Sequence, residues 1–543
     1  MTLRDVAARW IEADPDDATR AQLAAILAAE DDNELARHCE HPLVFGTAGL
    51  RGEVMAGPAG MNRLSVRRAT QGVVAWLDER GMDPSRGVVV GRDARHGSEA
   101  FNDEVVSVLL GAGWVVHEMP GPLPTPLVAF AVKRLGAAAG IMITASHNPP
   151  QDNGYKLYGD DGSQIIAPHD ERVEHFMSLA GEPVLADRSS PHHREIDASL
   201  VADYRTHMVG RFGVGDSDLA ITYTPLHGVG GATMLDLFAA AGYANVSIVE
   251  AQFAPDPTFP TLPFPNPEEP GALDLAMAAA DEAGSDLVLA NDPDADRLGV
   301  ALRGPSGWRV LRGDEIGWLL GDMLLREAQS GDVVATSLVS SSMLATMAAA
   351  AGVECVTTLT GFKWISRAGA GRRLLFGYEE AIGFAVDPLV ADKDGLSAAL
   401  AIARLATHLA REGSSLLARL DEIEARFGVH AIGALSVRAQ GAGGLERLSE
   451  ALAALTATPP SRLGEEVVTA TFDLSAGWRG LATPGVVLEF ANGRVVVRPS
   501  GTEAKVKAYV ELVAPAEDLA ATRARLAAAV AGVASDLAAR LRV

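Results

Sequence analysis

The chain has 543 residues, 48% of them hydrophobic, and its 46 basic and 70 acidic residues give a formal net charge of −24 at pH 7. Since domains average about 150 residues, this length predicts several domains with sizeable cores. The negative charge disfavours nucleic acid and anionic membranes as partners, so an anionic small-molecule substrate needs local basic residues.

The N-terminal sequence MTLRDVAARWIEADPDD has neither the basic nor the apolar region of a signal peptide. No run approaches the roughly 18 apolar residues of a membrane span. Two cysteines, Cys39 and Cys355, cannot supply a disulfide framework. We therefore expect a cytoplasmic protein, and its oligomeric state, monomer or dimer, is left open.

Residues 1–40 are rich in alanine, with acidic residues near helix starts, which predicts a helical lead-in. The loop FGTAGLRGE at 45–53 follows, and it either suits close approach to an oxyanion or forms an ordinary turn. Strand and helix then alternate up to residue 146, which predicts a parallel sheet with helical crossovers. The expected helices are 67–79, 98–110 with Ser98 as its cap, and 126–135, and the expected strands are 87–90, 114–119 and 140–144.

The same alternation restarts twice, and the C-terminal part has a different pattern of strands. A proline-rich segment at 254–270 is expected to be an ordered surface loop or clamp. The expected strands are 219–223, 245–249, 286–290, 333–339, 356–359, 374–376, 465–475, 486–490, 494–497 and one ending at 513, and the expected helices include 271–283, 313–327, 341–352, 391–411 and 516–541.

These patterns predict an α/β fold of three similar domains with mixed, mostly parallel sheets. A smaller C-terminal α+β domain with an antiparallel sheet completes the chain. We place the four domains at residues 1–205, 206–312, 313–430 and 431–543.

The stretch IMITASHNPP reads as a buried strand that ends abruptly in a loop of small residues. The loop displays the hydroxyl of Ser146 next to the imidazole of His147, and Pro149 and Pro150 prevent a helix from following directly. With Lys156 close by, Ser146 is a candidate phosphoryl carrier or nucleophile. A Ser-His hydrolase is disfavoured because the G-x-S-x-G elbow is missing.

Three carboxylates, Asp292, Asp294 and Asp296, alternate in NDPDADR after another apolar strand. They repel one another unless a hard cation binds, and oxygen ligands suit Mg²⁺. The glycine and distal glutamate of an EF-hand are missing, which excludes that calcium site. The alternative is a solvated acidic turn.

Two later motifs are suited to a phosphorylated, hydroxyl-rich ligand. In RPSGTE, Arg498, Ser500, Gly501 and Thr502 offer a guanidinium, hydroxyls and free backbone N–H groups to a phosphate, although a tight turn has the same composition. In GYEEAIG, Glu379 is suited to accept hydrogen bonds from sugar hydroxyls, although acidic residues are also common at helix starts. Together, the motifs predict Mg²⁺-assisted phosphoryl transfer to or from a polyhydroxylated substrate.

The motifs TASHNPP with NGYK, NDPDADR, GYEEAIG and RPSGTE, in this order, resemble the α-D-phosphohexomutase superfamily of phosphoglucomutases and phosphomannomutases. The resemblance runs from FGTAGLRGE to RPSGTEAK. GYEEAIG, TGFKW and ADKDG are similar to the branch that includes bacterial phosphoglucomutases and the eukaryotic phosphopentomutases and glucose-1,6-bisphosphate synthases. The resemblance implies four domains around a central cleft.

Residue roles also follow from this resemblance. Ser146 would be a phosphoserine that shares Mg²⁺ with Asp292, Asp294 and Asp296. Near the transferred phosphoryl group the resemblance places Arg51, His147 and Lys156, the last as general acid or base. The implied substrate-binding residues are Arg297, Thr360, Gly361, Lys363, Glu379, Arg498, Ser500, Gly501 and Thr502.

The implied reaction interconverts hexose 1-phosphate and hexose 6-phosphate, of glucose or mannose, through a bound 1,6-bisphosphate that also serves as activator. One departure concerns Ala381, where many hexomutases have a serine two positions after the sugar-binding glutamate. Phosphopentomutase and glucose-1,6-bisphosphate synthase activities therefore stay open as alternatives. A non-catalytic sugar-phosphate-binding protein is disfavoured because the serine and aspartate motifs are both intact.

Overall fold

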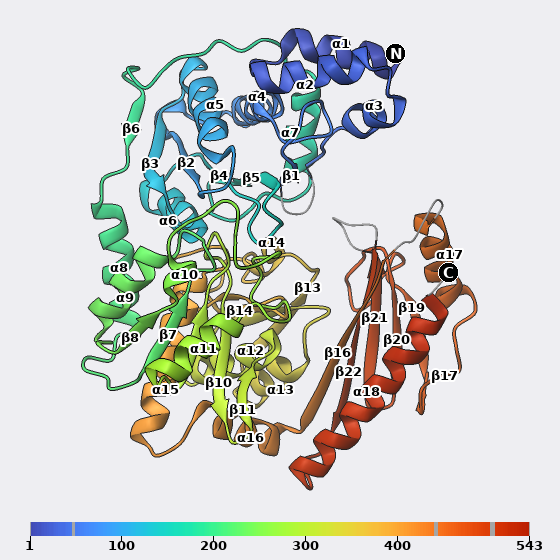
Figure 1. Cartoon of the computed structure of the whole chain (residues 1–543). Coiled ribbons are helices and arrows are strands. Elements are labelled where there is room, and N and C mark those ends of the chain that lie inside the picture. The colour runs from blue at the N-terminus through green and yellow to red at the C-terminus, as the bar shows by residue number, and fades with distance from the viewer. Residues whose placement is uncertain (1, 46–48, 439–443, 500–504, 542–543) are drawn as a thin grey trace. The chain divides into compact units, whose positions relative to one another are not determined.

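The computed structural model describes residues 2–45, 49–438, 444–499 and 505–541 (Figure 1). The chain forms two compact units. Unit 1 contains the residues up to Leu311 together with Gly383–Thr407, and unit 2 contains Arg312–Ile382 and the residues from His408 onward. The predicted division into four domains remains a prediction.

The helical lead-in is confirmed. Side chains of Thr2, Asp16 and Asp31 accept hydrogen bonds from the first turns of three helices, and the apolar faces of these helices pack together around Trp10 and Leu23. The helices are α1 (Leu3–Ala13), α2 (Asp17–Ala28) and α3 (Asp32–Cys39).

The first sheet of unit 1 has the strand order β1-β5-β4-β2-β3-β6, in which β3, β2 and β4 are parallel and β5 is antiparallel to both of its neighbours. Its strands are β1 (Leu50–Glu53), β2 (Val88–Arg92), β3 (Val116–Pro122), β4 (Ala139–Ile143), β5 (Asp152–Tyr158) and β6 (His193–Glu195). The associated helices are α4 (Arg63–Glu79), η1 (Pro84–Arg86), α5 (Ser98–Gly111), α6 (Thr125–Leu135) and α7 (His169–Ser178).

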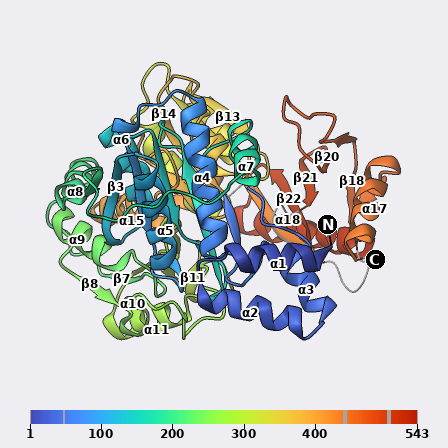
Figure 2. The ribbon, with the colours of Figure 1, turned by 90° about the horizontal axis from the view of Figure 1, so that it is seen from above.

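Helices cover both faces of this sheet. Val88 and Val90 of β2 belong to the core formed with α4 and α5, and Figure 2 shows α4 beside α7. On the other face, a Cβ at Gly140 would lie 2.5 Å from a methyl carbon of Val132, so only glycine lets α6 pack this closely. Burial on both faces explains why the central strands β2 and β4 are almost wholly apolar.

In this region one strand was missed and one sequence expectation was wrong. The missed strand is β5, which carries Lys156. Ser98 does not cap α5, because the cap is Gly97 at φ 80° and the Ser98 hydroxyl donates instead to Asp93 Oδ1 at 2.6 Å. The nearby buried carboxylate competes with the helix end for that hydroxyl.

The second sheet of unit 1 has the order β11-β10-β9-β7-β8, with β7, β8 and β9 parallel. The hairpin of β10 and β11 was not predicted. The elements are α8 (Ser199–Phe212), β7 (Ile221–Thr224), α9 (Gly231–Ala241), β8 (Val246–Ile248), α10 (Glu250–Phe253), α11 (Asp274–Ala283), β9 (Leu287–Ala290), β10 (Gly299–Gly304) and β11 (Gly307–Val310). The segment Gly383–Thr407, which also belongs to unit 1, contains β15 (Gly383–Ala385), which is not a strand of this sheet, and most of α15 (Gly395–Arg411).

Unit 2 begins with a parallel sheet in which β12 lies between β13 and β14. β14 extends through Glu379, so this glutamate ends the strand and does not follow it. The elements are α12 (Gly313–Leu325), β12 (Val333–Ser337), α13 (Met343–Ala350), β13 (Glu354–Thr358), α14 (Phe362–Ile365), β14 (Leu374–Glu379) and α16 (Leu416–Phe427).

The C-terminal part of unit 2 is an antiparallel sheet of order β16-β22-β21-β20-β19, against which the long helix α18 packs. This confirms the predicted fold class: three α/β segments with mixed sheets and an antiparallel C-terminal domain. The elements are β16 (Val429–Arg438), α17 (Gly444–Ala457), β17 (Arg462–Leu463), β18 (Glu466–Val467), β19 (Ala470–Asp473), β20 (Val486–Phe490), β21 (Gly493–Pro499), β22 (Lys505–Ala514) and α18 (Leu519–Leu541).

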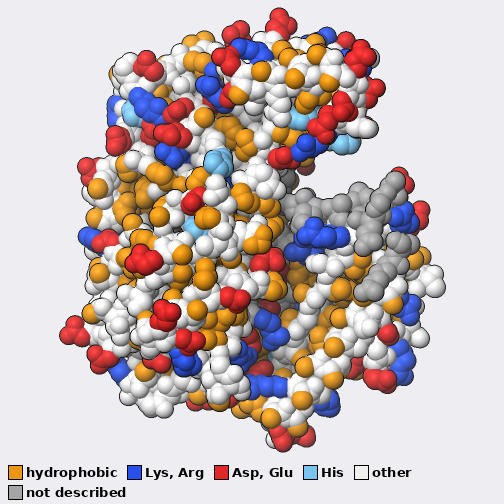
Figure 3. All heavy atoms as spheres, in the orientation of Figure 1, with side chains coloured by type: hydrophobic (Ala, Val, Ile, Leu, Met, Phe, Trp, Pro, Cys, Tyr) orange, Lys and Arg blue, Asp and Glu red, His pale blue; other side chains and the backbone are white. Residues whose placement is uncertain are grey.

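Among the described helices, none combines the length and the apolar character that a membrane crossing requires. Figure 3 shows acidic side chains dispersed over the visible face of the N-terminal helices, as the net charge of −24 leads one to expect. Basic residues therefore have to be sought locally, within the candidate site.

Candidate active site

Ser146 lies in the loop that connects β4 to β5, at the carboxyl end of a central parallel strand. Its backbone is left-handed, with φ 52°, and its N–H donates to Thr144 Oγ1 at 2.9 Å. The side chain is buried, and its hydroxyl donates to Asp292 Oδ2 at 2.8 Å. A non-glycine residue costs free energy in this conformation, and such strain is concentrated at functional sites.

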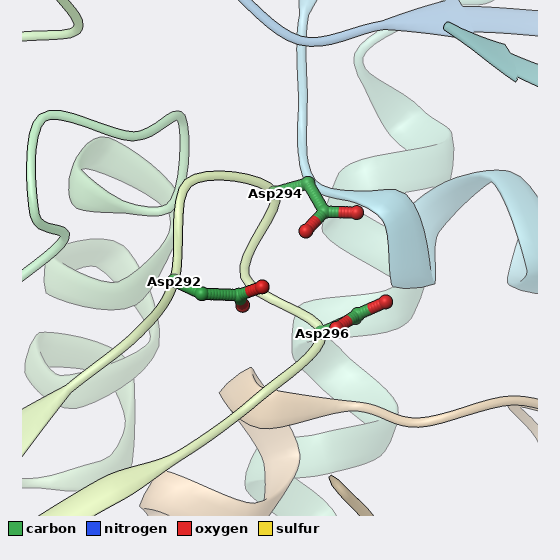
Figure 4. A group of neighbouring side chains, drawn as sticks. All are labelled: Asp292, Asp294 and Asp296. Atoms are coloured by element: carbon green, nitrogen blue, oxygen red, sulfur yellow. The ribbon is translucent and has the colours of Figure 1, made fainter. Parts of the chain in front are cut away.

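The predicted acidic motif forms the turn between β9 and β10 (Figure 4). Each of Asp292, Asp294 and Asp296 offers a carboxylate oxygen, these atoms lie within 4.8 Å of one another, and all three side chains are buried. Ala295 has φ 56°, and its N–H donates to Asp292 O at 2.8 Å, which closes the turn. The strand ends thus bring the hydroxyl of Ser146 and the acidic motif together.

Two lysines neutralise part of this negative charge. Lys156 Nζ on β5 lies 2.7 Å from Oδ2 of both Asp294 and Asp296, and Lys393 Nζ lies 3.3 Å from Asp296 Oδ2. Burial alone raises the pKa of the Asp296 carboxyl, but the charges of the two lysines hold it well below its usual range. Lys156 is correspondingly held as an ammonium, because the two carboxylates outweigh the effect of burial and raise its pKa.

Asp292 is in a different electrostatic state. Burial and the neighbouring carboxylates Asp294 and Asp296 raise its pKa well above the usual range. Oδ1 of Asp294 and Oδ1 of Asp296 are buried and have no hydrogen-bond partner within the part of the chain that the structure describes. Oxygens of this kind are ready to accept a cation.

His147 and Arg51 flank the serine. Arg51 lies on β1, is half-buried, and donates to Asn148 Oδ1 at 3.0 Å. The His147 ring packs against Phe264, with 6.3 Å between the centroids. Burial, together with the positive charges of Arg297 and Arg51, lowers the pKa of His147 well below its usual value, so its imidazole is neutral at pH 7. Arg297 itself lies between Glu268 and Asp296, at 3.6 and 3.9 Å.

Other sequence-predicted residues form a second group within unit 2. Glu379 Oε1 accepts a hydrogen bond of 2.6 Å from the N–H of Gly361, which has φ 111°. Arg498 at the end of β21 donates to Thr360 Oγ1. Lys363 is buried in the adjoining turn of α14. Of the predicted phosphate loop, Ser500, Gly501 and Thr502 lie outside the described residues.

Sequence reasoning missed two positively charged residues in unit 1. Lys393 lies in ADKDG, which was interpreted as the start of a helix and as a similarity to one branch of the superfamily, without a role for the lysine. Arg95 lies in GRDARHGSE after β2 and contacts the Ser146 loop. Arg95 could have been found from its position: it follows a strand that is parallel to β4, and the loops after parallel strands lie at the same edge of a sheet.

Models of the phosphoglucomutase/phosphomannomutase family match four stretches of the chain: α/β/α domain I at 42–181, domain II at 202–305, domain III at 312–426 and the C-terminal domain at 482–529. The probable phosphoribomutase of Schizosaccharomyces pombe is 35% identical and covers 94% of this chain and 93% of its own. The probable phosphomannomutase of Haemophilus influenzae is 37% identical and covers 83% and 93%.

The chain belongs to the phosphoglucomutase/phosphomannomutase family. The resemblance to the α-D-phosphohexomutase superfamily is confirmed, and this member is a phosphosugar mutase, an isomerase of carbohydrate metabolism. The relatives divide between pentose and hexose phosphates, so the family does not fix the sugar.

Solved structures of the family share the fold. The Paramecium phosphoglucomutase pp63/parafusin superposes with a TM-score of 0.71 at 18% identity, covering 92% of this chain and 95% of its own. The Aspergillus fumigatus N-acetylphosphoglucosamine mutase, solved with GlcNAc-6P and magnesium, gives 0.53 at 14% identity and covers 93% and 96%.

Proposed function

We propose that this family member moves a phosphoryl group between the anomeric and the terminal oxygen of a sugar, with Ser146 as the phosphoryl carrier. One observation supports this most directly: a strained, buried serine hydroxyl contacts Asp292, one of three clustered carboxylates. A phosphorylated Ser146 is in a position to share a cation with those carboxylates.

The donor set fits Mg²⁺. All the candidate ligands are carboxylate oxygens, and the buried Oδ1 atoms of Asp294 and Asp296 have no hydrogen-bond partner among the described residues. We propose that Asp292, Asp294 and Asp296 hold the ion together with phosphorylated Ser146. When bound, Mg²⁺ supplies charge stabilisation to a phosphoryl group in transfer.

The protein groups have separate tasks in this proposal. The bond between phosphorus and Ser146 Oγ breaks as a sugar oxygen forms its own bond to phosphorus, and the resulting bisphosphate later returns its other phosphoryl group to Ser146. Lys156, held as an ammonium, acts as the general acid: it gives a proton to Ser146 Oγ as the bond to phosphorus breaks and takes up the proton that the sugar hydroxyl loses. The cations of Arg51 and Arg297 offset charge on the phosphoryl group, and His147 lines its path as a neutral imidazole.

In unit 2, we propose that Glu379, with Thr360, Gly361 and Lys363, binds sugar hydroxyls. Arg498, together with Ser500, Gly501 and Thr502, binds the phosphate that does not react. The Glu379–Gly361 and Arg498–Thr360 contacts support a shared site for the two groups.

We propose the hexose phosphates of glucose and mannose as substrates, with the 1,6-bisphosphate as activator. Ribose or deoxyribose 1- and 5-phosphates are a second candidate, which Ala381 and the similarity to the S. pombe phosphoribomutase favour. A coupled assay with glucose, mannose and ribose 1-phosphates distinguishes the two, because the preferred sugar shows the highest kcat/KM.

Intact-mass analysis after incubation with glucose 1,6-bisphosphate tests the carrier. We expect one added phosphoryl group in the wild type and none in Ser146→Ala, together with loss of mutase activity. Ser163→Ala, at another buried serine of unit 1, is the control and keeps the added mass. Phosphorylation of the Ser146→Ala protein, or near-normal turnover by it, contradicts the proposal.

A further inference from the structure

Arg95 lies in the loop that follows β2, and β2 is the parallel neighbour of β4. The loops after the two strands therefore meet, and Asp93 N–H donates to Ile143 O at 3.0 Å where they begin. Arg95 is only 4% exposed although it carries a permanent charge. A buried guanidinium of this kind calls for a structural or functional reason.

The guanidinium of Arg95 donates to four backbone carbonyls of the serine loop. Nη2 lies 2.6 Å from Ser146 O and 2.6 Å from Asn148 O, and Nη1 lies 2.8 Å from Pro149 O and 3.1 Å from Asp152 O. The loop supplies few donors of its own. The N–H of Asp152 donates to Pro149 O at 3.1 Å, but Pro149 and Pro150 have no N–H and the backbone of Ser146 is left-handed. The guanidinium of one arginine therefore supplies the hydrogen-bond donors that backbone N–H groups supply to carbonyls in helices and sheets.

Arg95 is itself held from two further directions. The ring of Phe259 lies against the guanidinium, 4.9 Å from its carbon, and comes from the proline-rich segment 254–270. Asp93 Oδ1 accepts from the N–H of Arg95 at 3.0 Å and from the hydroxyl of Ser98 at 2.6 Å. These contacts fix both the backbone and the plane of the arginine, so its four donated bonds have one available orientation.

We propose that Arg95, held in place by Phe259, is a positioning residue that fixes the Ser146 loop so that the serine oxygen faces the acidic motif. This inference rests on the proposed role of Ser146 as phosphoryl carrier. Arg95 acts through the backbone of the loop, so its loss displaces the reacting oxygen without removing a contact to the sugar. A displacement of about 1 Å is enough to reduce a reaction rate about 10²-fold.

A simpler role is that of a counter-charge for nearby carboxylates, above all Asp93, whose Oδ2 lies 3.4 Å from Arg95 Nε, and this role makes a different prediction. Lysine keeps the charge but lacks the planar fork, so it cannot donate to four carbonyls at once. Arg95→Lys therefore separates the two roles, and Arg95→Met removes both charge and fork.

The experiment compares wild type with Arg95→Lys, Arg95→Met and Phe259→Leu by steady-state kinetics and by hydrogen–deuterium exchange of residues 145–152. Arg86→Lys is the matched control, because Arg86 also donates to two carbonyls, Gly136 O and Ala137 O, but away from the serine loop. We expect kcat to fall about 10²-fold in Arg95→Lys with KM changed less than about twofold, because the loss concerns the transition state. Exchange should rise in residues 145–152 and stay unchanged elsewhere, and Phe259→Leu should show the same pattern more weakly.

Two results overturn the proposal. One is an Arg95→Lys enzyme with near-normal kcat and unchanged loop exchange, and the other is a fall in activity with raised exchange throughout unit 1, which indicates general destabilisation. If the Arg95 variants do not fold, Phe259→Leu becomes the deciding variant. A Phe259→Leu enzyme with normal kcat and normal exchange of residues 145–152 then overturns the proposal. If wild-type Ser146 takes up no phosphoryl group, the proposed function is contradicted. In that case, hydrogen–deuterium exchange of residues 145–152 still tests whether Arg95 fixes the loop.

Discussion

The ammonium nitrogen of Lys156 lies 2.7 Å from Oδ2 of Asp294, and the two side chains are 3% and 0% exposed. A pair this deeply buried is costly to break, because the remaining carboxylate keeps its charge without a partner. The same lysine also pairs with Asp296, so the acidic motif depends on it when no cation is bound.

Lys156→Met should therefore lower the free energy of unfolding by about 3–5 kcal/mol in chelator-treated protein, as measured by urea denaturation. Mg²⁺ should stabilise this variant more than the wild type, since the ion replaces the missing charge. Lys133→Met is the control, because Lys133 donates to a backbone carbonyl, Pro388 O, at 2.7 Å and lies outside the acidic motif. Equal losses in the two variants, or no added effect of Mg²⁺, contradict this expectation.

Asp314 in unit 2 should make stability depend on pH. Burial raises its pKa to about 7, and its Oδ1 accepts from the N–H of Ser341 at 2.7 Å and from the hydroxyl of Tyr378 at 2.8 Å. Between about pH 4 and pH 7 the folded protein keeps a proton that the unfolded chain has lost, so the contribution of Asp314 to stability falls as pH rises. The slope is about 1.4 kcal/mol per pH unit.

Asp314→Asn keeps a neutral group with an oxygen at the same position, so its stability should lack this part of the pH dependence. Thermal or urea unfolding of both proteins from pH 4 to pH 8 measures the difference. Glu422→Gln removes an exposed carboxyl of unit 2 and serves as the control. Parallel stability curves for wild type and Asp314→Asn across this range count against the assignment.

The left-handed backbone of Ser146 should be visible in stability as well. Glycine adopts φ 52° without a Cβ clash, so Ser146→Gly should be about 1 kcal/mol more stable than Ser146→Ala, although neither carries a hydroxyl. Ser163 is not among the residues with positive φ in the described ranges. There, Ser163→Ala should be more stable than Ser163→Gly. The same order at both positions would contradict the strain at Ser146.

Local patterns were enough to find some parts of the site. The spacing of Asp292, Asp294 and Asp296, and the position of Ser146 after an apolar strand, are properties of short segments, and the structure places these residues together. Lys393 and Arg95 were missed because their role depends on pairing between distant segments; Arg95 is 51 residues from the serine whose carbonyl it binds. The local sequence around Lys393 or Arg95 does not indicate which strands are neighbours in the sheet.

The strand β5 shows the same limit for the fold. Its residues pair antiparallel with both β1 and β4, although the surrounding pattern of alternating strands and helices predicts mostly parallel neighbours. The strand begins directly after the loop that carries Ser146, and its sequence DNGYKLY mixes polar and apolar residues, so no strand was predicted here. Tertiary pairing decided the outcome and also placed Lys156 beside the acidic motif.

The path of the chain has a consequence for synthesis on the ribosome. Unit 1 is completed only when Gly383–Thr407 has been made, after the whole stretch Arg312–Ile382 of unit 2. A nascent chain that ends at Leu311 already contains Asp296 and Lys156 but not Lys393, the second cation beside that carboxylate. The charge balance of the acidic motif is thus reached late in translation. The order in which residues emerge delays its complete set of charges until most of the chain has been made.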